Sequence, residues 1–393
     1  MKRLFNASIM MSLIFITSSC NNNSKKYSFT VKGTLSNSNN EWVMISQLTP
    51  ETSTLIDSVK LDDSGRFELK IKANQSPELF LLKVKDYPER ITLLLEDDEV
   101  VDISGDALYL NKTYIVSGSK GSENIRNLNK GIKHFMSQAD SVFFAYRSQK
   151  VKEDTIKPMQ IDSIMDSYFK KVHDFVADFC IQNKDNLASI IGLYSKYGDN
   201  LILDSKLDKE VFKTIGQAIF AKYPENTHAI NINKIVEELL QEEKRLAEVE
   251  TTLNAGQPAP NLILNNPTGE KMDLSTFKGK NVILYFWYAT NKDCWDVNKE
   301  LKTIYRDYKD KDLEILSVSM DHDKLQWANT IALDNLAWKN VIADENTSKI
   351  YNIKDQPRLF LINSNGLIEA KDISIDSVKT YLQNQINIEA NGK

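Results

Sequence analysis

The chain has 393 residues, of which 41% are hydrophobic and 26% are charged, and its formal net charge is −5 at pH 7. This length and balance are typical of a globular protein of two or three domains. The acidic balance, with no basic cluster beyond Lys25 and Lys26, excludes a nucleic-acid-binding surface, so we expect no nucleic-acid partner.

The first 19 residues have the pattern of a secretory signal peptide. A positively charged start is followed by an apolar run from Ile9 to Ile16, too short to span a membrane, and by three small residues before Cys20. A cysteine in this place resembles the lipobox of bacterial lipoproteins, which implies that Cys20 is the acylated mature N-terminus; a plain signal peptide is the alternative. We therefore expect a tether at residues 20–26 and contact with a membrane through the N-terminal lipid. The expected location is the cell envelope, facing the periplasm, at the outer membrane.

From residue 27 to residue 119 the chain has the two-residue period of half-buried strands. The apolar runs are short and are separated by turns such as Asp62–Gly65. The alternation is clearest at Phe29, Val31, Leu35, Phe67, Leu69 and Ile71. This pattern predicts an N-terminal β-sandwich domain. The acidic group Glu96–Glu99 lacks the spacing of a calcium loop and is interpreted as a solvated hairpin tip.

Residues 120–253 change to apolar stripes at intervals of three and four residues, the period of amphipathic helices. The stripes run from Ile125 to Tyr146, from Ile161 to Phe179 and from Ile232 to Val249. Packing between neighbouring helices accounts for such stripes without a bound cofactor. The region is predicted to be an α-helical connector that ends at a helix breaker beginning with Asn254.

Metal and cofactor sites are not indicated by the sequence. The four histidines have no metal-ligand spacing to one another or to a cysteine, and there is no glycine-rich phosphate loop. If Cys20 is acylated, the remaining thiols are Cys180 and Cys294, which lie in different predicted domains. We interpret both as buried small residues rather than as a disulfide. We therefore expect no metal and no cofactor, and thiol chemistry, if present, at Cys294.

Residues 282–288 are a run of β-branched and aromatic residues, which predicts a fully buried central strand in a domain that covers 254–393. The polar turn after this strand can start a helix, and the dipole of a helix stabilises a thiolate near its first turn. The residues in that place are Asn291-Lys292-Asp293-Cys294.

This region resembles the thioredoxin-like module of membrane-anchored thiol:disulfide oxidoreductases of the TlpA and ResA type, a group of redoxins. The stretches that carry the resemblance, in order, are Gly256–Pro260, Leu274–Val282, Phe286–Thr290, Ser317–Asp321 and Tyr351–Gly366. The resemblance implies a C-terminal α/β thioredoxin-like fold and a cis peptide bond at Gln356-Pro357. Leu93–Asp106 also resembles an uncharacterised β-domain that precedes thioredoxin modules in many Gram-negative lipoproteins. The whole chain is thus expected to be multidomain.

The resemblance fails at the catalytic pair. Exchange needs an exposed thiolate that attacks and a second thiol that resolves the mixed disulfide, and the family supplies them as Cys-x-x-Cys. Asn291 occupies the attacking position, and Cys294 keeps the inward position, where shielding should leave it protonated. The surrounding positions also depart from the family pattern, at Tyr285, Thr290 and Trp295 and at the spacer Lys292-Asp293.

Binding can persist without the thiol pair. In the family, the backbone beside the cis-proline hydrogen-bonds an extended polypeptide. The resemblance therefore implies a substrate- or partner-binding surface made of Trp287, Thr290, Trp295, Gln356 and Pro357. For Trp295 the alternative is a core position, because a residue one turn past a helix start can point inward.

Three functions stay open on the sequence alone. The first is a binding module for a polypeptide or an envelope protein, redox-inactive or impaired because of Asn291. The second is an enzyme, a one-cysteine thiol-disulfide oxidoreductase or a peroxide-reactive enzyme that uses Cys294. The third is a purely architectural role for the β-domain and the helices.

Overall fold

The structure is a computed structural model that describes residues 27–38, 40–153 and 158–391; the side chains of 145–153, 158–162, 164 and 386–391 are not described. The predicted signal peptide, Cys20 and the predicted tether lie outside the described residues. Within the described part, no helix combines the length and the apolar character needed to cross a bilayer. The chain divides into two compact units, one up to Leu239 and one from Leu240 onward.

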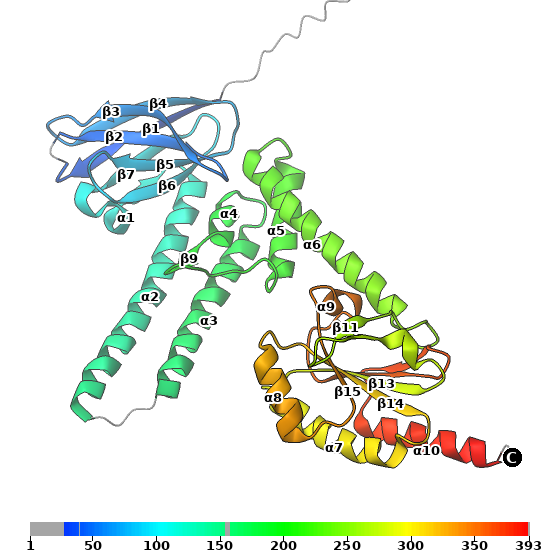
Figure 1. Ribbon diagram of the computed structural model, residues 1–393. Coiled ribbons are helices and arrows are strands. Elements are labelled where there is room, and N and C mark those ends of the chain that lie inside the picture. The colour runs from blue at the N-terminus through cyan, green and yellow to red at the C-terminus, as the bar shows by residue number, and fades with distance from the viewer. Residues whose placement is uncertain (1–26, 39, 154–157, 392–393) are drawn as a thin grey trace, which may run out of the picture. The chain divides into compact units, whose positions relative to one another are not determined.

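The N-terminal unit begins with two four-stranded sheets (Figure 1). The first has the order β4 (Arg66–Ala73), β1 (Tyr27–Ser36), β7 (Val100–Asp106) and β8 (Ile115–Ser117). The second has the order β3 (Ser53–Lys60), β2 (Trp42–Leu48), β5 (Glu78–Val84) and β6 (Arg90–Leu95). A 3-10 turn at Ala107–Tyr109 and the short helix α1 (Leu110–Thr113) join β7 to β8.

Both sheets contribute to one apolar core, as in a β-sandwich. Phe29 and Val31 of β1 lie in the same buried cluster as Val43 and Ile45 of β2. The predicted alternation is confirmed, because all six residues that carried it are buried. The sequence pattern therefore identified the faces of β1 and β4 that pack inward.

Helices follow the strands within the same compact unit. They are α2 (Lys120–Glu153), α3 (Pro158–Gln182), α4 (Ala188–Leu193), α5 (Lys209–Lys222) and the first part of α6 (Thr227–Thr252), with a small hairpin of β9 (Lys196–Tyr197) and β10 (Asn200–Leu201). Leu79 and Leu94 turn away from the sandwich core and join the buried cluster of the helices. The predicted boundary at 119/120 therefore lies between the strands and the helices. The two parts are joined by the buried cluster of the helices, to which the strands contribute.

The C-terminal unit is built on a seven-stranded mixed sheet. Its strands, in spatial order, are β12 (Lys271–Asp273), β11 (Ile263–Asn265), β15 (Lys339–Ile342), β14 (Leu313–Ser319), β13 (Asn281–Trp287), β16 (Arg358–Ile362) and β17 (Ile368–Lys371). A 3-10 turn at Leu274–Phe277 precedes β13. The helices are α7 (Lys292–Tyr308), α8 (Lys324–Asp334), α9 (Thr347–Ile350) and α10 (Ile375–Asn391).

Strand β13 is central and buried on both faces, which confirms the prediction for residues 282–287. It pairs in parallel with β14 and antiparallel with β16. Ile283, Tyr285 and Trp287 face a core shared with α7 and α10, which cover that side of the sheet in Figure 1. The residues of β13 that alternate with these three face a second core on the opposite side of the sheet. This double burial explains the unbroken apolar run in the sequence.

The end of α6 belongs to the C-terminal unit. Leu253 is fully buried in the core that also contains Val282, Leu284 and Tyr351. The sequence instead predicts this part of the chain to belong to the connector, because its helical period continues without a break up to the turn at Asn254.

Candidate functional site

The candidate site lies where β13 ends and α7 begins. Asn291 is the N-cap of α7: its backbone is extended, and its Oδ1 accepts a hydrogen bond from the N–H of Asp293 at 2.9 Å. Such a bond satisfies one of the amide donors left free at a helix start. The predicted helix start after the strand is therefore confirmed.

Asn291 also reaches across to a second segment. Its Nδ2 donates to the carbonyl oxygen of Gln356 at 2.9 Å. The peptide bond between Gln356 and Pro357 is cis, as predicted. The residue at the attacking position thus caps the helix with one end of its amide and holds the cis-proline loop with the other.

Cys294 lies one turn inward from Asn291 and is fully buried. Burial raises the pKa of its thiol, and hydrogen bonding to the Tyr288 backbone and the Tyr285 side chain offsets only part of this rise. Among the described residues its sulfur forms no disulfide. The sulfur at this position is therefore shielded, as the sequence predicts, and the direction of its pKa shift favours the thiol over the thiolate.

The other thiol, Cys180, has a similar environment in the N-terminal unit. It is fully buried, its Sγ lies 3.5 Å from the carbonyl oxygen of Ser189, and burial raises the pKa of its thiol to about 12. Both described cysteines are therefore buried side chains without a disulfide.

The two tryptophans of the predicted binding surface differ in exposure. Trp295 is 40% exposed, and its Nε1 donates to the carbonyl oxygen of Ala289 at 2.7 Å, which fixes the indole beside the helix start. Trp287 is fully buried and stacks with Tyr285, with ring centroids 6.2 Å apart. The side chain of Trp287 therefore lies beneath the surface, because strand alternation turns it toward α7.

The remaining residues of the predicted surface are accessible. Thr290 is exposed, and Gln356 and Pro357 are half-buried. A groove of about 910 Å³ lies along the ends of β13, β14 and β15, and Tyr288, Asp321 and Gln356 are among its lining residues. The structure thus places Gln356 at the edge of a space large enough for several side chains.

Asp321 supports this region and was not singled out from the sequence as a site residue. Its Oδ2 accepts hydrogen bonds from the N–H of Ala289 at 2.9 Å and from Ser319 Oγ at 2.7 Å. It therefore joins the turn after β13 to the end of β14. The signal of this role in the sequence is a carboxylate two residues after a buried strand.

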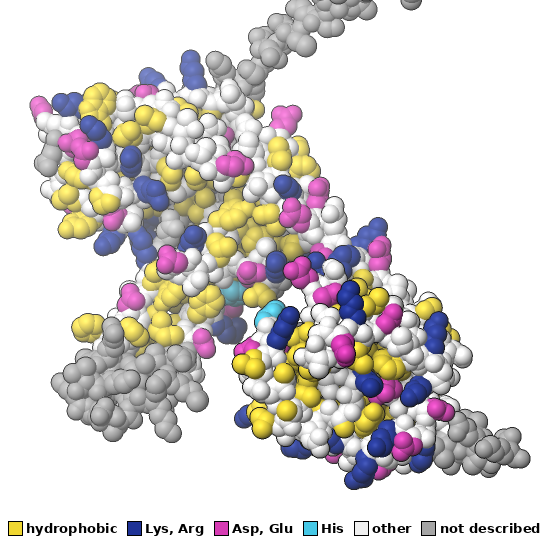
Figure 2. All heavy atoms as spheres, in the orientation of Figure 1, with side chains coloured by type: hydrophobic (Ala, Val, Ile, Leu, Met, Phe, Trp, Pro, Cys, Tyr) yellow, Lys and Arg dark blue, Asp and Glu magenta, His cyan; other side chains and the backbone are white. Residues whose placement is uncertain are grey.

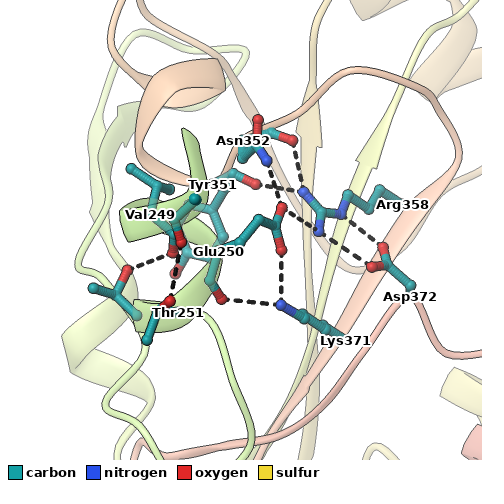
Figure 3. Close-up of polar contacts among 10 residues, drawn as sticks. Val249, Glu250, Thr251, Tyr351, Asn352, Arg358, Lys371 and Asp372 are labelled. Carbon is teal, nitrogen blue, oxygen red and sulfur yellow. Dashed lines mark hydrogen bonds and ion pairs between the residues drawn. The ribbon is translucent and has the colours of Figure 1, made fainter. Parts of the chain in front are cut away.

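The cis-proline loop is held from its other side by Arg358 (Figure 3). The Nη1 of Arg358 donates to the carbonyl oxygens of Tyr351 and Asn352, both at 2.7 Å. Its Nε bonds Asp372 at 2.7 Å, and its Nη2 lies 3.3 Å from Glu250. Planar, multidentate pairing of this kind suits arginine better than lysine.

Glu250 brings the end of α6 into the same network, drawn in Figure 3. It accepts from Lys371 Nζ at 2.7 Å and from the side-chain amide of Asn352. Burial pushes its pKa up, but hydrogen bonds from Lys371 and Asn352 and the charges of Arg358 and Lys371 outweigh this effect, so the pKa is lowered. No sequence motif indicated this role, since Glu250 is one of several acidic residues on α6.

Basic and acidic side chains are interspersed over the face drawn in Figure 2. In the described part of the chain, no group of three or more His, Cys, Asp or Glu side chains is arranged to hold a metal ion.

A buried central strand that leads into a capped helix beside a cis-proline defines a thioredoxin-like protein. Residues 255–371 match the AhpC/TSA family, and residues 29–125 match a domain of unknown function, DUF4369. The C-terminal part of the chain is similar to curated proteins named thiol-disulfide oxidoreductase ResA. The one from Geobacillus kaustophilus is 30% identical over 122 residues, which cover 30% of this chain and 69% of the relative.

A second ResA, from Bacillus thuringiensis, is 28% identical over 135 residues, 34% of this chain and 78% of the relative. A solved structure, the C-terminal domain of a putative thiol-disulfide oxidoreductase from Bacteroides thetaiotaomicron, is 32% identical, covers 34% of this chain and 96% of its own, and has a TM-score of 0.33. Through its C-terminal part, the chain belongs to the family of ResA-type thiol-disulfide oxidoreductases.

Because the pKa of Glu250 is lowered in the folded chain, we expect this residue to make the free energy of unfolding depend on pH. The unfolded chain takes up the proton at the ordinary glutamate pKa of about 4.3, above the folded pKa. The stability contributed by ionised Glu250 is therefore complete above that range and is lost as the pH falls through the folded pKa. We expect Glu250→Gln to lower the free energy of unfolding at pH 7 by about 1 kcal/mol and to flatten its decline from about pH 5 to pH 3.

Urea unfolding at a series of pH values measures this. Glu248→Gln is the matched control, because Glu248 lies on the same helix with its side chain 68% exposed and 3.9 Å from Lys244. Parallel stability curves for wild type and Glu250→Gln would contradict the assignment.

Proposed function

We propose that this protein is a lipid-anchored, periplasm-facing thioredoxin-like protein that binds a polypeptide or an envelope protein and does not catalyse thiol-disulfide exchange. The observation that carries the proposal is the engagement of Asn291. Its amide stands where exchange requires a thiolate, and both ends of that amide are already bonded, to Asp293 and to Gln356.

The chemistry of exchange leaves no role for an amide at the first position. A thiolate must attack a disulfide sulfur and form a mixed disulfide, and a carboxamide has neither the charge nor the sulfur for this step. Cys294 is a poor substitute, because it is fully buried and its pKa is raised. These features argue against the one-cysteine oxidoreductase and the peroxide-reactive enzyme.

The binding part of the proposal depends on the backbone beside Pro357. The carbonyl oxygen of Gln356 has one partner in Asn291 and retains a second lone pair. Among the described residues, none accepts a hydrogen bond from the Gln356 N–H. An extended polypeptide can therefore pair with this residue as an added strand, while Thr290 and Trp295 border the contact.

The first prediction from this proposal concerns activity. The wild-type chain should reduce insulin and refold scrambled ribonuclease no faster than background. Asn291→Cys restores Cys-Lys-Asp-Cys and should give measurable activity, though weak, because Thr290 and Trp295 also depart from the family pattern. Cys294→Ser in that variant is the control and should abolish the gain.

Two results separate the alternatives. Wild-type turnover that Cys294→Ser abolishes would establish the one-cysteine enzyme. An inactive Asn291→Cys variant that nevertheless forms the disulfide between positions 291 and 294 would show that the surroundings, and not the missing sulfur, block exchange.

A second prediction concerns binding. A photoreactive residue at Thr290, which is exposed beside the cap, should give discrete adducts in whole cells. The same residue at Thr303, exposed further along α7, is the control and should not. Adducts that are absent from both positions, or equally diffuse at both, would favour the architectural role.

The anchor is tested separately from the site. Cells that produce the wild-type chain and are given a labelled fatty acid should incorporate it into this protein, and Cys20→Ala should not. Equal labelling of the two proteins would refute acylation at Cys20.

A further inference from the structure

A second groove lies between α7 and α8 in the C-terminal unit. Its volume is about 420 Å³. The residues that line it are Ala289, Trp295, Asn298, Lys299, Lys302 and, from α8, Thr330, Leu333 and Asp334. It shares only Trp295 with the surface proposed above for polypeptide binding, so variants of Asn298, Lys302 and Leu333, which lie outside that surface, test it independently.

Asn298 is the unusual residue of this groove. It lies on the buried stripe of α7 with Cys294, Leu301 and Ile304, and it is only 1% exposed. Neither its Oδ1 nor its Nδ2 has a hydrogen-bond partner among the described residues. A buried polar group without a partner is destabilising, so an apolar side chain would be expected at this position. The amide is explained if its partner enters from the groove.

The geometry of an amide restricts what that partner is. Asn298 presents an N–H donor and a carbonyl acceptor side by side, and both are satisfied at once by the backbone N–H and C=O of one residue in an extended chain, which point to the same side of the strand. Two of the lining residues offer exposed apolar surface: Trp295 is 40% exposed with its N–H already bonded to Ala289, and Leu333 is 85% exposed. The backbone of one extended residue, flanked by apolar side chains, therefore matches Asn298 and these two residues.

The charges at the rim add a preference. Lys299 is paired with Asp296 at 2.8 Å, and this hydrogen bond together with the nearby charge of Asp334 raises the pKa of Lys299. Lys302 is half-buried and has no ion pair within the described part of the chain. The cation that is available to a ligand is therefore Lys302, and its complement is a carboxylate.

We propose that the groove between α7 and α8 binds a short extended segment of a polypeptide that carries an acidic side chain between apolar ones. The backbone N–H and C=O of one residue of the segment pair with Asn298, the carboxylate faces Lys302, and the apolar side chains pack on Trp295 and Leu333. The proposal goes beyond the function proposed above, because it concerns a different groove and a defined peptide chemistry.

The test uses the whole chain after the signal peptide, with tryptophan labelled by nitrogen-15 at the indole, and the probe acetyl-Leu-Glu-Leu-amide. The chain has five tryptophans, and Trp295→Phe identifies the signal of interest. We expect a saturable shift of the Trp295 signal with the glutamate peptide and roughly tenfold weaker binding of acetyl-Leu-Lys-Leu-amide, a difference of about 1.4 kcal/mol.

Variants then assign the contacts. Asn298→Leu should abolish the saturable shift and at the same time raise the urea midpoint, because it removes an unpaired buried amide. A purely structural asparagine would instead lower that midpoint. Lys302→Gln and Leu333→Ala should each weaken binding without unfolding the chain. Leu325→Ala, at an exposed position of α8 outside the groove, is the matched control and should change nothing.

The proposal is overturned if the Trp295 signal does not saturate, or if Asn298→Leu binds the glutamate peptide as tightly as wild type does. It is also overturned if Asn298→Leu lowers the urea midpoint, since the amide would then be satisfied within the fold. A different result is that a photoreactive residue at Thr290 gives no adducts while the Trp295 signal still responds to the glutamate peptide. That result would contradict only the proposed binding surface beside Pro357.

Discussion

The hydrogen bonds of one side chain, Asn291, hold the candidate site together. The amide caps α7 through Asp293 and reaches the carbonyl oxygen of Gln356, so the helix start and the cis-proline loop are joined through a single residue. Because β13 is buried on both faces, it fixes where that helix begins. The inward position of Cys294 follows, since a residue one turn along a helix that packs on the sheet points into the core. A position that carries reactive sulfur in the Cys-x-x-Cys pattern here has a structural role.

A second layer of contacts extends this dependence to the end of α6. Arg358, directly after Pro357, bonds two backbone carbonyls of the loop and reaches Glu250. The support of the loop therefore begins before residue 255, where the match to the AhpC/TSA family starts. Leu253, the residue directly after α6, lies in the same buried cluster as Tyr351 and adds an apolar contribution. The thioredoxin-like part of this protein is thus completed by a helix that enters from the preceding region of the chain.

The site and the groove between α7 and α8 illustrate opposite uses of the same functional group. The amide of Asn291 is satisfied at both ends, and this engagement restrains the loop that a polypeptide would contact. The amide of Asn298 is buried without a partner in the described part of the chain, although it lies on the same helix only two turns away. Burial makes such a group costly, and that cost is the physical reason to look for a ligand there.

The sequence by itself determined the elements whose signals are local. The apolar run at 282–287 identified the buried central strand, the polar turn after it identified the start of α7, and the alternation at Phe29 and Val31 identified the core face of β1, because burial leaves a periodic trace along one segment. Only the tertiary structure decided which segments meet. It buried Trp287, left Trp295 partly exposed, joined Glu250 to Arg358 across 108 positions of the chain and left Asn298 unpaired. These outcomes depend on which faces of distant helices and strands pack together. The sequence of a single segment does not indicate which distant segments it contacts.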